Sequence, residues 1–265
     1  MERHTDEAQP PALVAHRGYA LHYPENTLPA IEAALEAGAG AVEFDVHMTA
    51  DEVPVLLHDA HLRRTGGVGG RIMDLDLEQA RRIEVNETSR LGSAFSGVRI
   101  PTLAEAVSVL ADWPGVDAFV EIKRESLRRF GTARVVERVL EAVEPIAGRC
   151  VVISYDAGAV ERARAAGASR IGWVIDSWGA SVRQTAETLA PDYLLCNHAI
   201  IPRECVLWPG PWRWVLFTVD DAERALELAA RGADLIETNA IGELLGHPRL
   251  RRRTGARARQ ERDGG

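Results

Sequence analysis

The sequence predicts an α/β fold, a closed (β/α)8 TIM barrel with a small insertion after the second strand. Short apolar runs alternate with segments of helical periodicity, and strict alternation is typical of a parallel sheet. Eight such runs can be counted, and from residue 150 onward they recur every 21 or 22 residues. The length of 265 residues and the hydrophobic content of 46% suit one large core. A doubly wound open sheet is the alternative.

The expected strands are short, and amphipathic segments separate them. The strands begin near residues 12, 41, 116, 150, 171, 192, 213 and 234. The first helix begins at Leu28 and ends before Gly38, and the others occupy roughly 102–112, 131–144, 157–166, 179–189, 221–231 and 240–246. In the third of these, the apolar residues recur at helical spacing and predict one buried stripe: Val135, Val136, Val139, Leu140 and Val143.

Residues 60–99 interrupt the alternation and follow an extra strand expected at 53–57. A glycine-rich loop and one short helix are expected there. Long loops of compact domains are usually functional or disordered, so we interpret this segment as a small cap-like insertion over a site. We expect residues 1–248 to form a single catalytic domain and the basic tail 249–265 to be disordered.

Composition excludes several classes of protein. The net charge of −8 argues against sequence-independent nucleic-acid binding. No apolar run approaches the roughly 18 residues that a spanning helix needs, and the N-terminus lacks a signal-peptide pattern, so no stable membrane insertion is expected. Cys150, Cys196 and Cys205 show no metal-binding spacing and fit a reducing compartment, which predicts a cytoplasmic protein. The oligomeric state cannot be read from the sequence.

Three carboxylates are expected to meet at one end of the barrel. Glu43 and Asp45 lie two residues apart on an expected strand, so both point to one side. Glu121 lies on the next barrel strand. Three unpaired like charges would repel, and a hard divalent cation with oxygen ligands, Mg²⁺ or Ca²⁺, removes this difficulty. The alternative is a set of surface carboxylates paired with arginines.

Two histidines and two cations surround the expected carboxylates. His16 and His58 each end an expected strand and could exchange protons near neutrality, although a lone histidine in this position is more often structural. Arg17 and Lys123 suit a phosphate, and Lys123 is the only lysine among the 31 basic residues. The set predicts metal-assisted displacement at phosphorus. A nucleophilic serine or cysteine motif, a P-loop and a dinucleotide fingerprint are absent from the sequence.

Several short segments match the motifs of one enzyme family. They are His16-Arg17-Gly18, Pro24-Glu25-Asn26-Thr27, Glu43-x-Asp45, Thr49-x-Asp51, Pro54-Val55-x-x-His58-Asp59, Leu62-Arg63-Arg64-Thr65, Ile100-Pro101-Thr102-Leu103 and Glu121-Ile122-Lys123. Through them the chain resembles the glycerophosphodiester phosphodiesterase family. The resemblance spans most of the chain and is most specific in its N-terminal half. It implies a barrel with a small insertion after the second strand.

The resemblance also implies roles for individual residues. It implies that Glu43, Asp45 and Glu121 bind the metal, and that His16 and His58 are the general acid and base. It further implies that Arg17 and Asn26 contact the metal-phosphate region, and that Lys123 holds the phosphoryl oxygens. Family members use Mg²⁺ or Ca²⁺, and these residues leave the choice open.

The C-terminal half departs from the family pattern. Phe217-Thr218-Val219 stands where a tryptophan usually begins the motif, and Glu237-Thr238-Asn239 replaces the usual Thr/Ser-Asp ending. Phe217 would keep an apolar wall near the substrate. Three other residues follow strands and could line the mouth of the barrel, with packing or loop structure as the alternative: Tyr155, Trp178 and His198.

The expected reaction is hydrolysis of a glycerophosphodiester to glycerol 3-phosphate and an alcohol. Water or a neighbouring hydroxyl of the substrate could be the nucleophile, and the sequence does not identify the alcohol or say which histidine is the acid. An alternative is a lysophospholipase D-like hydrolase of lipid phosphodiesters, which would need an apolar groove over the site. A non-catalytic phosphodiester-binding protein is a third hypothesis, against which the two histidines and three carboxylates argue.

Overall fold

The computed structural model describes residues 10–250 and confirms the predicted barrel. Eight parallel strands follow one another in the order β1, β9, β8, β7, β6, β5, β4, β2, and pairing of β2 with β1 closes the ring. Each strand begins within one residue of its predicted position. The strands are β1 (Ala12–His16), β2 (Ala41–Met48), β4 (Asp117–Ile122), β5 (Cys150–Ser154), β6 (Arg170–Ile175), β7 (Tyr193–Asn197), β8 (Arg213–Phe217) and β9 (Leu235–Thr238).

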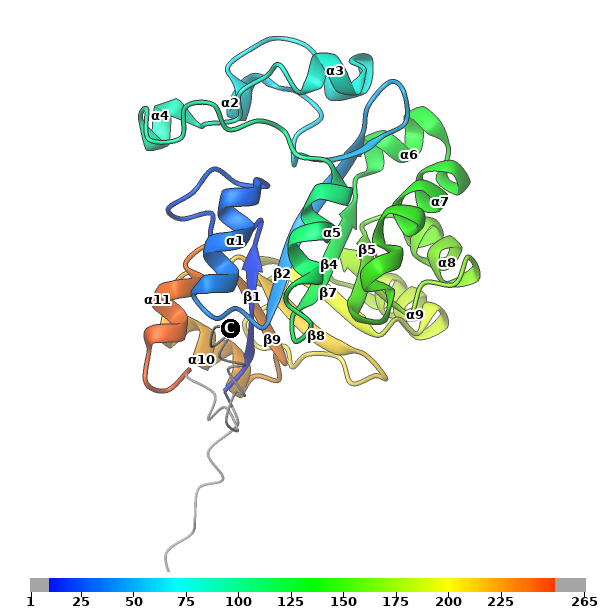
Figure 1. The fold of residues 1–265 in the computed structure, drawn as a ribbon. Coiled ribbons are helices and arrows are strands. Elements are labelled where there is room, and N and C mark those ends of the chain that lie inside the picture. Colours follow the sequence, from blue (N-terminus) through cyan, green and yellow to red (C-terminus); the bar gives the residue numbers. More distant parts are fainter. Residues whose placement is uncertain (1–9, 251–265) are drawn as a thin grey trace, which may run out of the picture.

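Helices connect the strands and cover the outside of the barrel (Figure 1). They are α1 (Leu28–Glu36), α5 (Leu103–Ala111), α6 (Arg124–Phe130), α7 (Thr132–Val143), α8 (Ala157–Ala165), α9 (Ala180–Leu189), α10 (Ala222–Ala230) and α11 (Ile241–Gly246). The sequence analysis missed α6, because this seven-residue helix buries only Ser126 and Leu127 and has no extended apolar stripe. None of the described helices combines the length and apolar character needed to cross a lipid bilayer.

The inward-facing side chains change in character along the strands. Apolar residues such as Val14, Phe119 and Val151 fill the interior of the barrel. Toward the C-terminal end of β2, inward positions pass from Ala41 to Glu43 and then Asp45, and all of these side chains are buried. Acidic side chains therefore occupy the end of the barrel at which TIM barrels carry their sites.

The segment between β2 and α5 folds into a separate small layer. It contains β3 (Pro54–Leu56), α2 (Arg63–Gly66), the 3-10 turn η1 (Ile72–Asp74), α3 (Leu77–Ala80) and α4 (Thr88–Leu91). The one short helix predicted here corresponds to α3, whereas α2 and α4 were not predicted, because helices of four residues are too short to show a helical period. Strand β3 pairs antiparallel with β2.

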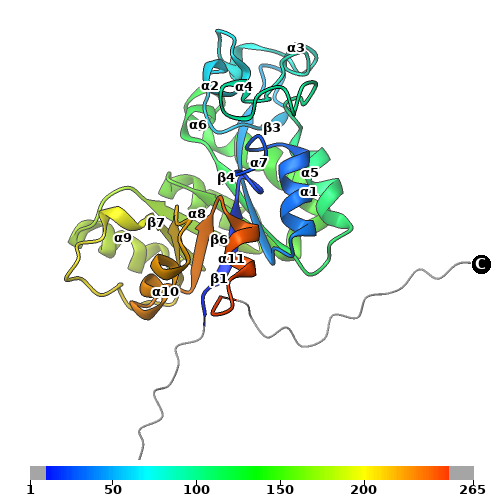
Figure 2. The same ribbon diagram turned by 90° about the vertical axis from the view of Figure 1, so that its left-hand side faces the viewer.

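This layer has its own hydrophobic cluster, which includes Val55, Leu62, Ile72 and Ile100. It lies at the end of the barrel toward which the β1 arrow points, and Figure 2 shows it above α1, α5 and α6 rather than above α9 and α10. Its role as a cap remains a prediction. Most of the predicted disordered tail, residues 251–265, lies outside the described residues.

The loop after β1 has an unusual backbone that positions Arg17. Arg17 and Gly18 both have positive φ angles, 55° and 80°. A Cβ atom on Gly18 would lie 2.5 Å from the backbone carbonyl carbon of Ala30 in α1. Here the backbone N–H of Tyr19 donates to the Ala30 carbonyl oxygen at 2.8 Å. Only glycine permits this close approach of the loop to the helix.

We therefore expect Gly18→Ala to lower the free energy of unfolding by about 1–3 kcal/mol, because the added methyl group overpacks the loop in a strained conformation. Urea denaturation measures this change. Gly40→Ala is the matched control, since its Cβ atom would meet nothing within 4 Å. Equal stability of the two variants would contradict the packing argument.

Candidate active site

Three carboxylates from two neighbouring strands meet at the C-terminal end of the barrel. Asp45 on β2 and Glu121 on β4 are paired in register, and Glu43 lies two residues before Asp45. One carboxylate oxygen from each residue lies within 4.8 Å of the other two. All three side chains are buried. The structure thus brings together the three residues predicted as metal ligands, and a divalent cation could be held among them.

Lys123 and Arg17 contact this cluster. Lys123 Nζ lies 2.6 Å from Asp45 Oδ1 and 2.7 Å from Glu121 Oε1. Arg17 Nε lies 3.1 Å from Asp45 Oδ2, although its N–H is not aligned for a hydrogen bond. Asn26 Nδ2 also donates to Asp45 Oδ2 at 2.8 Å, and Asn26 Oδ1 accepts from the Asp45 backbone N–H at 2.9 Å. Asp45 is therefore held by three other side chains.

These surroundings shift the pKa of each carboxyl group differently. Burial raises the pKa of Glu43 well above its ordinary value, and Asp45 adds to the shift. Burial also raises the pKa of Glu121. At Asp45, burial is outweighed by Lys123 and Arg17, which hold the pKa well below its usual range. Because two of the three carboxyl groups resist ionisation here, an added cation would stabilise their charged forms.

His16 is the last residue of β1, and its orientation is fixed by an amide. Its Nδ1 donates to Asn239 Oδ1 at 2.9 Å, and Asn239 Nδ2 donates in turn to Asp220 Oδ2 at 3.1 Å. Since the amide oxygen only accepts, the proton of the neutral ring sits on Nδ1 and Nε2 is the acceptor. Burial lowers the pKa of His16 to about 4, and Arg17 contributes to this shift. The ring is therefore neutral at pH 7.

His58 faces a carboxylate instead. Its Nδ1 donates to Asp59 Oδ1 at 2.6 Å, and Asp59 Oδ2 accepts from Arg64 Nε, also at 2.6 Å. Arg64 binds both oxygens of Glu25, and Glu25 Oε1 accepts from Arg17 at 3.1 Å. Burial lowers the pKa of His58, although Asp59 opposes this shift. An ionised partner stabilises the protonated imidazole more than a neutral amide does.

Both histidines line a single cavity of about 220 Å³, which we call the inner cavity. Arg17 and Lys123 also line it, as do Glu43 and Glu121. The opposite wall is largely apolar and is formed by Ile153, Val174, Leu195 and Phe217. The inner cavity therefore combines a charged wall from β1, β2 and β4 with an apolar wall from β5 to β8.

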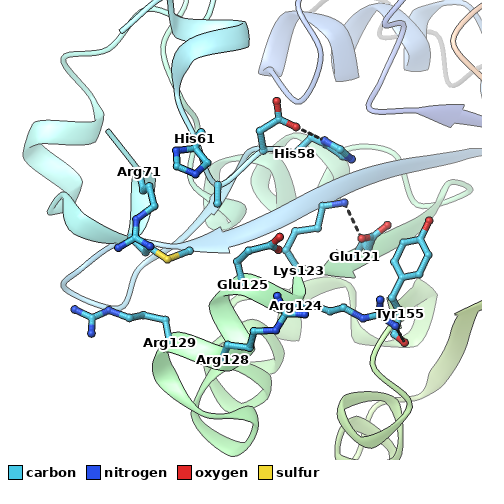
Figure 3. A pocket seen from close by; sticks show the side chains of 13 residues that line it. His58, His61, Arg71, Glu121, Lys123, Arg124, Glu125, Arg128, Arg129 and Tyr155 are labelled. Atoms are coloured by element: carbon cyan, nitrogen blue, oxygen red, sulfur yellow. Dashed lines mark hydrogen bonds and ion pairs between the residues drawn. The ribbon is translucent and has the colours of Figure 1, made fainter. Parts of the chain in front are cut away.

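A larger and more open space of about 850 Å³, the outer groove, adjoins the inner cavity. The two share four lining residues: His58, Glu121, Lys123 and Tyr155. Figure 3 shows Arg124, Arg128 and Arg129 extending from α6, with Arg71 and His61 coming from the insertion. A ligand could therefore occupy the inner cavity and continue into a groove with a cationic rim.

Some of the other residues predicted to line the site do so, and others do not. Phe217 lines the inner cavity, and Tyr155 lines both spaces. Trp178 instead stacks on Trp208, with ring centroids 3.9 Å apart. His198 Nδ1 accepts from Arg224 at 3.3 Å. Asn26, Trp178 and His198 line neither space, so the packing and loop alternatives hold for Trp178 and His198.

The sequence analysis missed the importance of Glu237, which lines the inner cavity from β9. Glu237 is 3% exposed, and burial raises its pKa to about 8, with contributions from Glu121 and Asp45. An acidic residue in the apolar run Leu235-Ile236-Glu237, on the same side as Leu235, was the available signal. The roles of Asn239 and Glu25 required contacts between distant parts of the chain, for which the sequence held no signal.

Comparisons with known proteins point to one enzyme family. The model of the glycerophosphoryl diester phosphodiesterase family matches residues 16–202. Glycerophosphodiester phosphodiesterase 1 from Rattus norvegicus is 47% identical over 97 residues, which are 37% of this chain and 29% of the relative. The glycerophosphodiester phosphodiesterase of Caldanaerobacter subterraneus subsp. tengcongensis is 37% identical over 100 residues, 38% of this chain and 40% of the relative. The matches thus span less than half the length of these two relatives.

Solved structures share the fold. A phosphodiesterase from Oleispira antarctica, solved in complex with the product sn-glycerol-3-phosphate, has a TM-score of 0.77 and 22% identity, covering 89% of this chain and 96% of the other. A glycerophosphodiester phosphodiesterase from Agrobacterium tumefaciens has a TM-score of 0.70 and 19% identity, covering 89% and 100%. Because the family model covers more than half of the sequence, the chain belongs to the glycerophosphoryl diester phosphodiesterase family.

Proposed function

We propose that this protein is a metal-dependent phosphodiesterase that hydrolyses glycerophosphodiesters to glycerol 3-phosphate and an alcohol. The observation that carries this proposal is the inner cavity, in which two histidines, two cations and two of the three clustered carboxylates line one small space. An acid, a base and charge-neutralising groups in one site are the requirements for displacement at phosphorus. The product complex of the Oleispira antarctica phosphodiesterase supports the choice of substrate.

The donor set fits a divalent metal. Glu43, Asp45 and Glu121 would hold it, since their oxygens come within 4.8 Å of one another and are all hard ligands. Burial raises the pKa values of Glu43 and Glu121 even with Lys123 and Arg17 beside the cluster, so a bound cation would favour their charged forms. When bound, Mg²⁺ or Ca²⁺ would supply Lewis-acid polarisation of a phosphoryl oxygen.

Side chains of the inner cavity would supply charge stabilisation and the acid and base. Arg17 and Lys123 line the inner cavity and would stabilise charge on the phosphoryl group. We assign His58 as the general acid, because its partner Asp59 is a carboxylate that favours a second ring proton. We assign His16 as the general base, because Asn239 accepts the proton of Nδ1 and so leaves Nε2 unprotonated and able to accept one. The nucleophile is water or the neighbouring hydroxyl of the substrate.

The outer groove favours a polar alcohol over a lipid. Its lining includes four arginines, three from α6 and Arg71 from the insertion. A lysophospholipid chain would need an apolar surface over the site, and this groove offers few apolar side chains, Met73 and Tyr155 among them. The lysophospholipase D-like alternative is therefore the weaker hypothesis, and a non-catalytic binding protein would have no use for a paired acid and base.

A phosphodiester panel with and without divalent metal tests the proposed function. We expect hydrolysis of glycerophosphocholine in Mg²⁺ or Ca²⁺, little hydrolysis of lysophosphatidylcholine, and loss of activity in chelator that added metal restores. Phosphorus NMR of the products measures all three. Activity that ignores chelator would contradict the metal assignment, and faster turnover of lysophosphatidylcholine would favour the lipid substrate.

The two histidine roles predict different dependence on the leaving group. His16→Ala should lose at least about a hundredfold in rate with any substrate, because a base is missing. His58→Ala should lose as much with glycerophosphocholine but far less with a glycerophospho-4-nitrophenyl ester, whose leaving group needs no proton. Initial rates on both substrates measure the difference.

His22→Ala is the control, because His22 is exposed and lines neither space. If His16→Ala rather than His58→Ala recovered on the nitrophenyl ester, the acid and base would have to be exchanged. Near-normal turnover in either variant would refute the acid-base pair.

A further inference from the structure

The carboxyl group of Glu237 neither binds the proposed metal nor transfers a proton in the proposed reaction. Its side chain is 3% exposed and lines the inner cavity. Its Oε1 is buried and makes no hydrogen bond within residues 10–250. A carboxyl oxygen buried without a partner is energetically unfavourable, so it is usually satisfied by a ligand or an ordered water.

The other acids at this end of the barrel already have partners. Asp45 and Glu121 bind Lys123. Glu43 Oε2 accepts from the backbone N–H of Arg17 at 3.1 Å. These three form the group of oxygens that lie within 4.8 Å of one another, and Glu237 is not a member of it. The free oxygen of Glu237 is therefore available to a molecule in the inner cavity.

The position of Glu237 indicates which part of a substrate it would meet. Glu237 on β9 pairs with Val14 of β1, and Val14 lies two residues before His16, which pairs with Glu43 of β2. Glu237 thus lies deeper in the barrel than His16, and away from the outer groove, whose lining it does not join. A diester with its phosphorus between the histidines would direct one of its two halves toward Glu237.

The chemistry of this deep region suits a small polyol. Apolar side chains of Ile153, Val174 and Leu195 would contact carbon-bound hydrogens, and Glu237 would accept a hydrogen bond from a hydroxyl.

We propose that the floor of the inner cavity is a glycerol-binding subsite in which Glu237 accepts a hydrogen bond from a substrate hydroxyl. Glu237 then selects diesters of glycerol over diesters that lack hydroxyls, and the second alcohol occupies the outer groove. This inference rests on the proposed function, because it places the phosphorus between His16 and His58.

Two phosphate monoesters that differ only in hydroxyl groups test the subsite: sn-glycerol 3-phosphate and propyl phosphate. In Mg²⁺, calorimetry should show that the wild-type protein binds glycerol 3-phosphate more tightly. Glu237→Leu should weaken this binding about two- to tenfold, the scale for one hydrogen bond to a neutral group. It should leave the affinity for propyl phosphate unchanged, because that ligand has no hydroxyl group for Glu237 to bind. Glu237→Gln, whose amide oxygen still accepts, should lie between.

Equal losses for both ligands in the Glu237 variants would overturn the proposal, since they would indicate an effect on metal binding or folding. Unchanged affinity for glycerol 3-phosphate would also overturn it. Thermal unfolding confirms that each variant is folded, and Glu36→Leu, at an exposed glutamate of α1, is the matched control. Failure of the proposed function is distinguishable, because the wild-type protein would then hydrolyse no glycerophosphodiester in the presence of metal.

Discussion

Asp45 and Glu121 are adjacent in register, and their mutual repulsion is the constraint to which the surrounding structure responds. Lys123 contacts both carboxylates, Arg17 pairs with Asp45, and Asn26 fixes the orientation of Asp45 through two hydrogen bonds. Breaking a buried pair of this kind leaves an uncompensated charge and typically costs about 3–5 kcal/mol. Arg17 lies in the strained loop and pairs with Asp45, so the conformation of this loop helps to neutralise the charge of the site.

Most of the barrel could be predicted from the sequence because its elements repeat. Strand positions followed from apolar runs, and the placement of Glu43 and Asp45 on one side of their strand followed from their spacing of two residues. Glu121 could be placed beside them because consecutive strands of a parallel barrel are neighbours. The position of His16 at the end of β1 followed in the same way.

The rest depended on contacts between distant segments. Asn239 reaches His16 across 223 residues, and Arg64 joins Asp59 to Glu25 from within the insertion. Such contacts leave no periodic pattern in the sequence. Helices α2, α4 and α6 were missed because they are shorter than two full turns. Glu237 was noted only as a departure from a motif, because its burial inside the barrel requires the closed sheet.

The central claim is that Glu43, Asp45 and Glu121 hold one divalent cation. Thermal unfolding of chelator-treated protein, with and without Mg²⁺ or Ca²⁺, tests it directly. A cation at about 100 times its Kd would stabilise the protein by ~2.7 kcal/mol, which corresponds to a rise in Tm of about 5–10 °C for a chain of this size. The account predicts this rise in the wild-type protein and its loss in Glu121→Gln. No rise in the wild-type protein, or an equal rise in the variant, would contradict it.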